Sequence, residues 1–241
     1  MSLISRLAIF PLTLTLALAA HQEPTYDLVW HPRADDTLTY KLKVDIESTP
    51  DKFTFTANVK SHVLKIKPNG DYDVETSTKD AHVIHGTHND PVPDDNKPTV
   101  DTYNSHGQKI STTEDNEPTE ETNPGFNTLD AVTDQLSPKD PVSKGGTWSA
   151  LVKPNAKLKK EAARVNYTLI GKIKEGPYQT LKIEYKYRET EKDNPVTAEG
   201  YILVNVDDFS LVRFEGTIKG ARFSDDPDFP NGDATLSIIR D

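Results

Sequence analysis

The fold class is decided by a stretch near the start of the chain, TLTYKLKVDI at residues 37–46. Apolar side chains occupy every second position of this stretch, and Thr, Lys or Asp lies between them. A period of two places the apolar side chains on one face of a β-strand and the polar side chains on the other face. The stretch therefore predicts a strand of an antiparallel sheet that has one buried face and one solvent-exposed face.

The residues that follow predict a β-meander. Residues 53–66 predict a second strand, with a β-bulge near His62 and Val63, where the apolar alternation changes phase. The sequence PNG at residues 68–70 predicts a tight turn, because Asn and Gly tolerate the positive φ angles that hairpin turns require. We expect residues 72–78 to return beside the second strand.

The second half of the chain repeats the alternation in longer segments. These segments predict strands at residues 147–152, 165–173, 181–187, 201–206, 211–223 and 234–239. The complete chain then has about ten antiparallel strands, a number that suits one sheet. We expect a single mainly β domain over residues 21–241, built as one strongly curved antiparallel sheet or a half-open β-barrel.

The middle of the chain interrupts this pattern. Residues 86–143 are rich in Pro, Asn and carboxylates, so they predict a loop-rich acidic segment with short strands only at 99–103 and 109–112. One short helix is predicted at residues 127–135, where Asn127 would cap the first turn. We expect this helix to lie across the sheet as a mid-chain connection.

Residues 1–20 predict a cleavable signal peptide. Arg6 precedes an apolar run over residues 7–20, which is shorter than the roughly 20 residues that a membrane-spanning helix needs. Small residues before Ala20 favour cleavage after Ala19 or Ala20. We therefore expect a protein exported to the periplasm or the extracellular space, which does not span a membrane after signal cleavage.

Composition narrows the classes of partner and of activity. The formal net charge is −10, an acidic balance that disfavours nucleic acid and anionic lipid surfaces as partners. The chain has no cysteine and contains no G-x-S-x-G, phosphate-binding glycine loop or H-E-x-x-H motif. We expect no cofactor, and the sequence leans towards a non-enzymatic protein without deciding the question.

One cluster of residues could bind a metal. His82, His85 and His88 are residue types that bind zinc and other transition metals. In a continuous strand His82 and His88 would point one way and His85 the other, so only a turn at Gly86 would gather all three. The alternative is a polar strand end that runs into a loop.

Aromatic residues in the predicted strands provide a second candidate site. Trp148, Tyr167, Tyr185 and Phe214 fall on the apolar faces of their strands and first suggest core packing. If the sheet curves without closing, the same face can line an apolar cavity for a lipid or another hydrophobic small molecule. We therefore take these four residues as candidate ligand-binding residues.

The order of these elements resembles a known kind of protein. An early TLTYKLKV strand, a PNG hairpin and the strand entry PVSKGGTW at residues 141–148 follow the predicted signal peptide. The chain resembles an uncharacterised family of exported bacterial proteins with a P-V-x-x-G-x-x-W strand entry. More remotely it is similar to the periplasmic lipoprotein-carrier superfamily. The second resemblance implies a half-barrel that shelters acyl chains, and no catalytic residues.

Three functional hypotheses follow. The first is a non-enzymatic exported envelope protein that binds a lipid or another hydrophobic ligand on the concave face of its sheet. The second is a structural or adhesive surface module that binds a protein partner and has a packed core without a cavity. The third is a metal-dependent enzyme that uses His82, His85 and His88.

Overall fold

The computed structural model describes residues 23–48, 51–92, 98–107, 109–113, 124–133, 137–154, 161–191, 193–222 and 231–241. The predicted signal peptide at residues 1–20 and the most acidic part of the middle segment, residues 114–123, lie outside these described residues. The described chain is mainly β, as the alternation of apolar residues predicts, and its strands pair antiparallel.

The described residues form fourteen strands and one helix. They are β1 Thr25–Tyr26, β2 Thr37–Ser48, β3 Asp51–Ile66, β4 Tyr72–His85, β5 His88–Pro91, β6 Thr99–Tyr103, β7 Lys109–Thr113, α1 Pro124–Thr133, β8 Val142–Ser143, β9 Thr147–Val152, β10 Ala163–Glu175, β11 Tyr178–Glu189, β12 Thr197–Asn205, β13 Leu211–Ala221 and β14 Gly232–Arg240.

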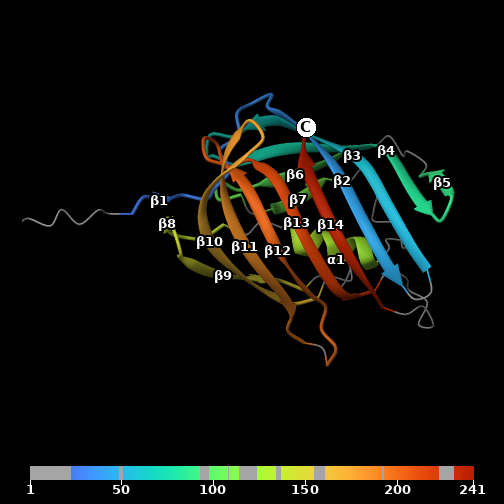
Figure 1. Cartoon of the computed structure of the whole chain (residues 1–241). Coiled ribbons are helices and arrows are strands. Elements are labelled where there is room, and N and C mark those ends of the chain that lie inside the picture. Colours follow the sequence, from blue (N-terminus) through green and yellow to red (C-terminus); the bar gives the residue numbers. More distant parts are fainter. Residues whose placement is uncertain are drawn as a thin grey trace, which may run out of the picture.

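Twelve of the strands form one sheet in the order β7-β6-β4-β3-β2-β14-β13-β12-β11-β10-β9, with β5 paired to β4 beside this path (Figure 1). The last strand, β14, lies between β2 and β13, so it joins the two halves of the chain. The edge strands β7 and β9 are not paired with each other, and the described sheet is not closed into a barrel. Strands β1 and β8 form a separate two-stranded sheet.

The predicted pairing of the second and third strands is confirmed, and the paired strands are longer than predicted. β3 pairs with β4 across the turn at Gly70, whose φ is 85°, and β4 continues to His85, well beyond the predicted residue 78. The register shifts between Val63 and Lys65, close to the predicted bulge, and shifts a second time between Thr56 and Asn58.

The helix begins earlier than predicted. α1 starts at Pro124, three residues before Asn127, because proline suits the first helical position, where a backbone N–H would have no partner within the helix. Asn127 therefore lies inside the helix and does not cap it. The last two predicted helical residues, 134 and 135, lie outside the described part of the chain.

The main core lies between α1 and one face of the sheet, which we call the inner face. Most of its buried residues come from α1, β2 and the strands from β9 to β14, and they include Val44, Leu129, Val152, Leu169 and Ile218. Figure 1 shows α1 behind β13 and β14. The helix thus packs on the sheet as a mid-chain connection, as predicted.

A second, smaller core lies near the start of β4. Val63, Tyr72 and Val74 are buried there, and Trp30 packs against Tyr72 edge to face, with ring centroids 5.5 Å apart. Trp30 and Trp148 therefore belong to different clusters.

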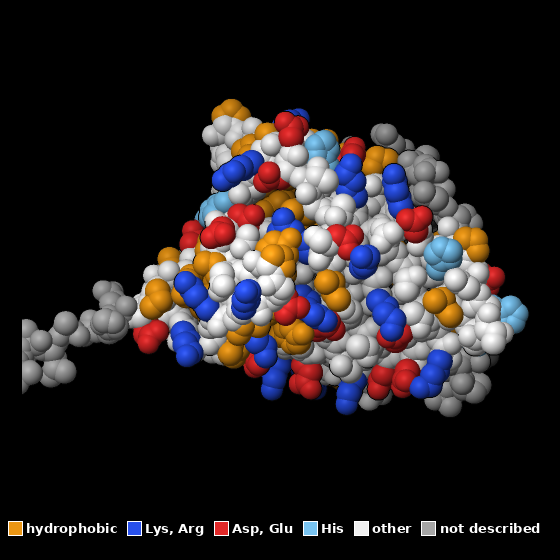
Figure 2. Space-filling view, turned by 45° about the horizontal axis from the view of Figure 1, so that its top comes forward, with side chains coloured by type: hydrophobic (Ala, Val, Ile, Leu, Met, Phe, Trp, Pro, Cys, Tyr) orange, Lys and Arg blue, Asp and Glu red, His pale blue; other side chains and the backbone are white. Residues whose placement is uncertain are grey.

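The visible outer surface is charged but mixed in sign. Figure 2 shows Lys and Arg side chains interspersed with Asp and Glu side chains over this view, so no single-sign patch dominates it. In the part of the chain that the structure describes, no helix has both the length and the apolar character needed to cross a membrane.

Candidate functional site

A line of residues crosses the inner face from one side of the sheet towards the other, and each member lies directly opposite the next in the strand register. This central row consists of Trp148, Tyr167, Tyr185, Gly200, Gly216, Leu236, Val44 and Phe55. Directly opposed residues of antiparallel strands share a face, so the row forms one continuous surface. All the side chains in it are aromatic or aliphatic.

The four predicted ligand-binding residues form two aromatic pairs on this surface. Trp148 stacks on Tyr167 with ring centroids 5.0 Å apart and planes 14° apart. Tyr185 contacts Phe214 with centroids also 5.0 Å apart and planes tilted by 32°. The structure therefore brings the four residues together on one apolar face, where Tyr167, Tyr185 and Phe214 are buried and Trp148 is half-buried.

Gly216 leaves room for the Tyr185 side chain on the row. Gly200 and Gly216 face each other on β12 and β13, and a β-carbon at residue 216 would stand 2.0 Å from the Tyr185 hydroxyl oxygen and 3.3 Å from its Cζ atom. Only glycine leaves room for the phenol at this point. Glycine inside a strand weakens the strand and often marks such a close approach, and this was the available signal in the sequence.

The hydroxyl group of Tyr185 is a polar group on the central row, as are the Tyr167 hydroxyl and the Trp148 indole N–H. The Tyr185 hydroxyl is buried and has no hydrogen-bond partner among the described residues. Burial raises the pKa of Tyr185 above its usual value, and Tyr167 and Glu215 raise it further, so the hydroxyl stays neutral near pH 7. A buried hydroxyl without a partner costs roughly 1–3 kcal/mol.

Helix α1 packs on the inner face beside β13. Its buried side chains, Leu129, Ala131 and Val132, belong to the same cluster as Tyr167, Tyr185 and Phe214. Tyr167, Tyr185 and Phe214 are buried in this core, so we expect that a ligand would reach them only if α1 moves.

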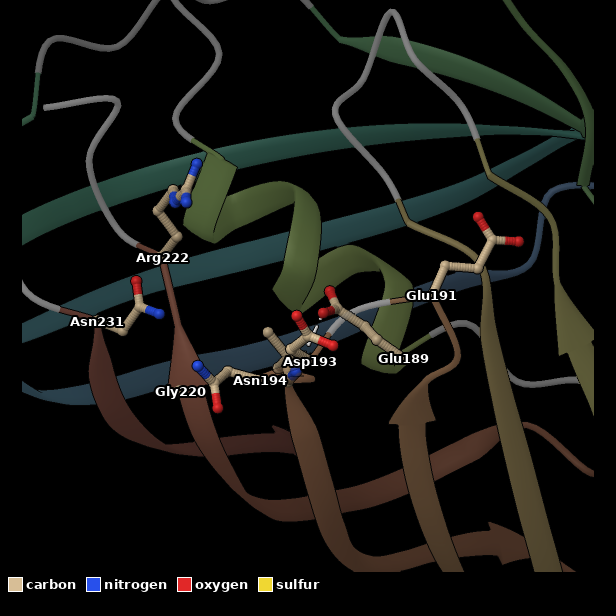
Figure 3. A pocket seen from close by; sticks show the side chains of 8 residues that line it. Glu189, Glu191, Asp193, Asn194, Gly220, Arg222 and Asn231 are labelled. Atoms are coloured by element: carbon tan, nitrogen blue, oxygen red, sulfur yellow. Dashed lines mark hydrogen bonds between the residues drawn. The ribbon is translucent and has the colours of Figure 1, made fainter. Parts of the chain in front are cut away.

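A pocket of about 450 Å³ lies at one end of the inner face (Figure 3). It is lined by Glu189, Glu191, Asp193, Asn194, Val196, Gly220, Arg222 and Asn231. Glu189 is buried, and its Oε2 atom accepts a hydrogen bond of 3.0 Å from the backbone N–H of Val196. None of the four predicted aromatic residues lines this pocket, and its own lining was not singled out from the sequence.

The three candidate metal-binding histidines do not converge. A turn at Gly86, with φ of 59°, places His85 directly opposite His88 on β5. His82 lies three residues before His85 on β4 and so on the other face. The turn at Gly86 that could have gathered all three histidines is therefore present, but it places only His85 and His88 opposite each other.

The structure gives His85 a packing contact. Its ring stacks on Phe53 with centroids 4.7 Å apart. In the described ranges, no group of three or more His, Cys, Asp or Glu side chains could hold a metal ion.

We compared the chain with models of known protein families and with curated proteins. No protein-family model matches the chain, and no curated protein matches it either. The resemblance to exported bacterial proteins and lipoprotein carriers thus stays a prediction from the order of motifs.

Proposed function

We propose that the protein is a non-enzymatic binding protein that holds a lipid, or another hydrophobic ligand with a hydrogen-bond acceptor, on its inner face. The observation that carries this proposal is the buried hydroxyl group of Tyr185, which has no partner among the described residues. A hydroxyl group buried on an apolar surface costs free energy, and a ligand carbonyl or carboxylate oxygen would remove that cost by accepting its hydrogen bond.

The rest of the central row suits the apolar part of such a ligand. Trp148, Tyr167 and Phe214 offer large flat surfaces beside Tyr185, and ligand sites are mostly apolar with a few placed polar groups. An alkyl chain would lie along these rings while Tyr185 fixes its position through one hydrogen bond.

The energies allow α1 to act as a removable cover. Displacing the helix exposes Leu129, Ala131 and Val132, at about 1.5–3 kcal/mol for each larger side chain. A buried chain of about twelve methylene groups contributes roughly 10 kcal/mol, at about 0.8 kcal/mol per group. The ligand can therefore offset the loss of the contacts that α1 makes.

We further propose that the sheet forms a half-open barrel and that the protein is exported. A half-open barrel that bends around α1 is supported by one cluster that joins Val44 of β2, Val152 of β9 and the helix. Residues 1–20 would direct export, and the protein would act in the periplasm or outside the cell. A carrier-like role, as the order of motifs suggests, follows if the bound ligand is a lipid.

Tryptophan fluorescence tests the proposal directly, because the chain has two tryptophans in different clusters. In a Trp30→Phe variant, Trp148 is the single reporter on the inner face. Titration with oleic acid should give a saturable change in its emission. The matched Trp148→Phe variant leaves Trp30 as reporter in the second core, and its emission should not change.

Two results would contradict ligand binding on the inner face. One is a Trp148 signal that does not saturate, and the other is an equal change at both tryptophans. Either result would favour the structural or adhesive surface module, whose packed sheet serves only as a scaffold.

A further inference from the structure

We propose that the pocket at the end of the inner face binds the polar head of the same ligand, and that this head is zwitterionic, with an ammonium group and a phosphate or carboxylate group. The inference rests on the proposed function, since it names the class of ligand. It concerns a separate set of residues, so it can fail without the proposed function failing.

The pocket continues the inner face beyond its apolar part. Tyr185, Tyr187 and Glu189 alternate along β11 with buried side chains, so they share the inner face. Val196, which lines the pocket, and Ala221, which lies between the lining residues Gly220 and Arg222, both belong to the main core. A ligand chain on the aromatic pairs would therefore bring its head to the pocket.

The two sides of the pocket carry opposite charges. The end of β11 supplies Glu189 and the connection to β12 supplies Glu191 and Asp193, whereas Arg222 follows β13 on the other side. Figure 3 shows the acidic side chains on the side of β11 and β12, and Arg222 with Asn231 on the side of β13 and β14. An ammonium group fits the first side and an anionic group the second.

Glu189 is the residue whose buried carboxylate would be stabilised by a cationic group of the ligand. Its exposed fraction is only 5%, and a buried carboxylate is costly unless it is paired and hydrogen-bonded. Its Oε2 atom accepts one hydrogen bond from Val196, and the described residues include no cation paired with it. An ammonium group in the pocket would supply the missing charge.

A β-bulge sets the position of Arg222. The register between β13 and β14 shifts between Ile218 and Ala221, and Gly220 has a φ of 72° and donates its N–H to Asp233 Oδ1 at 3.1 Å. Bulges of this kind redirect side chains at the ends of strands. The guanidinium group of Arg222 can then bind a phosphate or a carboxylate through two N–H groups.

The balance of charges selects against a purely anionic head. Among the described lining residues, Glu189, Glu191 and Asp193 outnumber Arg222, and like charges repel an anionic head that has no ammonium group. A zwitterionic head can satisfy both sides of the pocket at once.

The test compares two short-chain lipids that differ only in the head. Dihexanoyl phosphatidylethanolamine is zwitterionic and dihexanoyl phosphatidylglycerol is anionic. Calorimetric titration should show that the protein binds the zwitterionic lipid about tenfold more tightly, the effect expected from one added charge-assisted hydrogen bond. Glu189→Gln should abolish this preference, because Gln keeps an acceptor for the Val196 N–H without the charge.

Arg222→Gln should weaken binding of both lipids, since both contain a phosphate group. Matched controls remove the same charges from exposed outer positions of neighbouring strands, as Glu199→Gln on β12 and Lys219→Gln on β13. These controls should leave both affinities unchanged.

The outcomes separate the two proposals. Equal affinity for both lipids, with a saturable Trp148 signal, overturns the inference about the head and leaves the proposed function standing. If neither lipid binds and the emission of Trp148 does not change, the proposed function fails. In that case free O-phosphoethanolamine decides the inference: shifts of the Val196 and Gly220 amide resonances support it, and unchanged resonances overturn it.

Discussion

The hydroxyl group of Tyr185 lies against the backbone of Gly216, so close that a β-carbon on residue 216 would stand 2.0 Å from the oxygen. This contact links a residue of β11 to a residue two strands away, over Gly200 on β12. It requires a glycine on β13, and the hydroxyl has no hydrogen-bond partner in the described structure. Stability and ligand binding can both be tested at this point.

Gly216→Ala should destabilise the protein by about 1–3 kcal/mol, the usual cost of overpacking a core. Urea unfolding measures the loss. Adding Tyr185→Phe to this variant should restore part of it, because the nearest remaining ring atom, Cζ, is 3.3 Å from the new β-carbon position.

Gly86→Ala is the control for Gly216→Ala, because its β-carbon would meet nothing within 4 Å and its positive φ adds only backbone strain. If Gly216→Ala costs no more than this control, Tyr185 does not lie over Gly216 in solution.

Tyr185→Phe alone should stabilise the ligand-free protein by about 1 kcal/mol, because it removes a buried hydroxyl that has no partner. The same change should weaken oleic acid binding by about tenfold, since the ligand loses one hydrogen bond to a charged group. Chemical unfolding and fluorescence titration measure the two effects.

Tyr201→Phe is the matched control for Tyr185→Phe. Tyr201 lies opposite Glu184 and Glu215, and Lys182 is 5.0 Å from the centre of its ring. Removing its hydroxyl should change neither stability by more than about 0.5 kcal/mol nor ligand affinity. A Tyr185→Phe protein with lower stability and unchanged affinity would show that the hydroxyl serves the fold.

The sequence could predict what depends on local periodicity. β2 follows the alternation of residues 37–46 because burial of one face imposes a period of two on any strand. The pairing of β14 with β2 could not be predicted from local patterns. It places Val44 opposite Leu236, and these two residues lie near opposite ends of the sequence. The contact of Tyr185 with Gly216 also depends on strand order, which periodicity does not contain.

Part of the candidate site could also be predicted from the sequence, and part of it could not. Trp148 and Phe214 were recognised because large aromatic residues on an apolar face are visible in the sequence. The polar pocket was missed because Glu189 and Arg222 lie at the ends of two different hairpins, and they resemble ordinary solvent-exposed charges until the strand order brings them together.

Asp73 should make the fold sensitive to acid. Lys67 holds the pKa of Asp73 at about 2 through a hydrogen bond, helped by Thr102 and Lys65 and opposed by burial. A lowered pKa stabilises the folded state above the unfolded value of 3.8, and this contribution is lost as the pH falls towards about 2. Asp73→Asn should therefore cost about 2 kcal/mol at pH 7 and little at pH 2.

Urea unfolding at both pH values checks the role of Asp73. Asp207→Asn removes a carboxylate from an exposed turn and should have no comparable effect at either pH. A loss that is equal at pH 7 and pH 2 would assign the effect to packing and not to the lysine pairs.

Val132→Asp tests whether α1 is a cover or part of the indispensable core. Val132 belongs to α1, and only 3% of its surface is exposed. Burying a carboxylate without a partner at this position costs too much free energy, so α1 should detach from the inner face. The sheet should keep a cooperative urea transition, while the exposed aromatic surface binds more of a hydrophobic dye and takes up oleic acid faster.

Thr133→Asp places the same charge on the next residue of α1, which is only half-buried, and should change neither dye binding nor uptake. Leu129→Ala loosens the helix without a charge and should show the same effects as Val132→Asp at smaller size. If both inward variants lose the urea transition altogether, the sheet cannot stand without α1. The helix would then be a fixed layer of the core, and a ligand could not enter by displacing it.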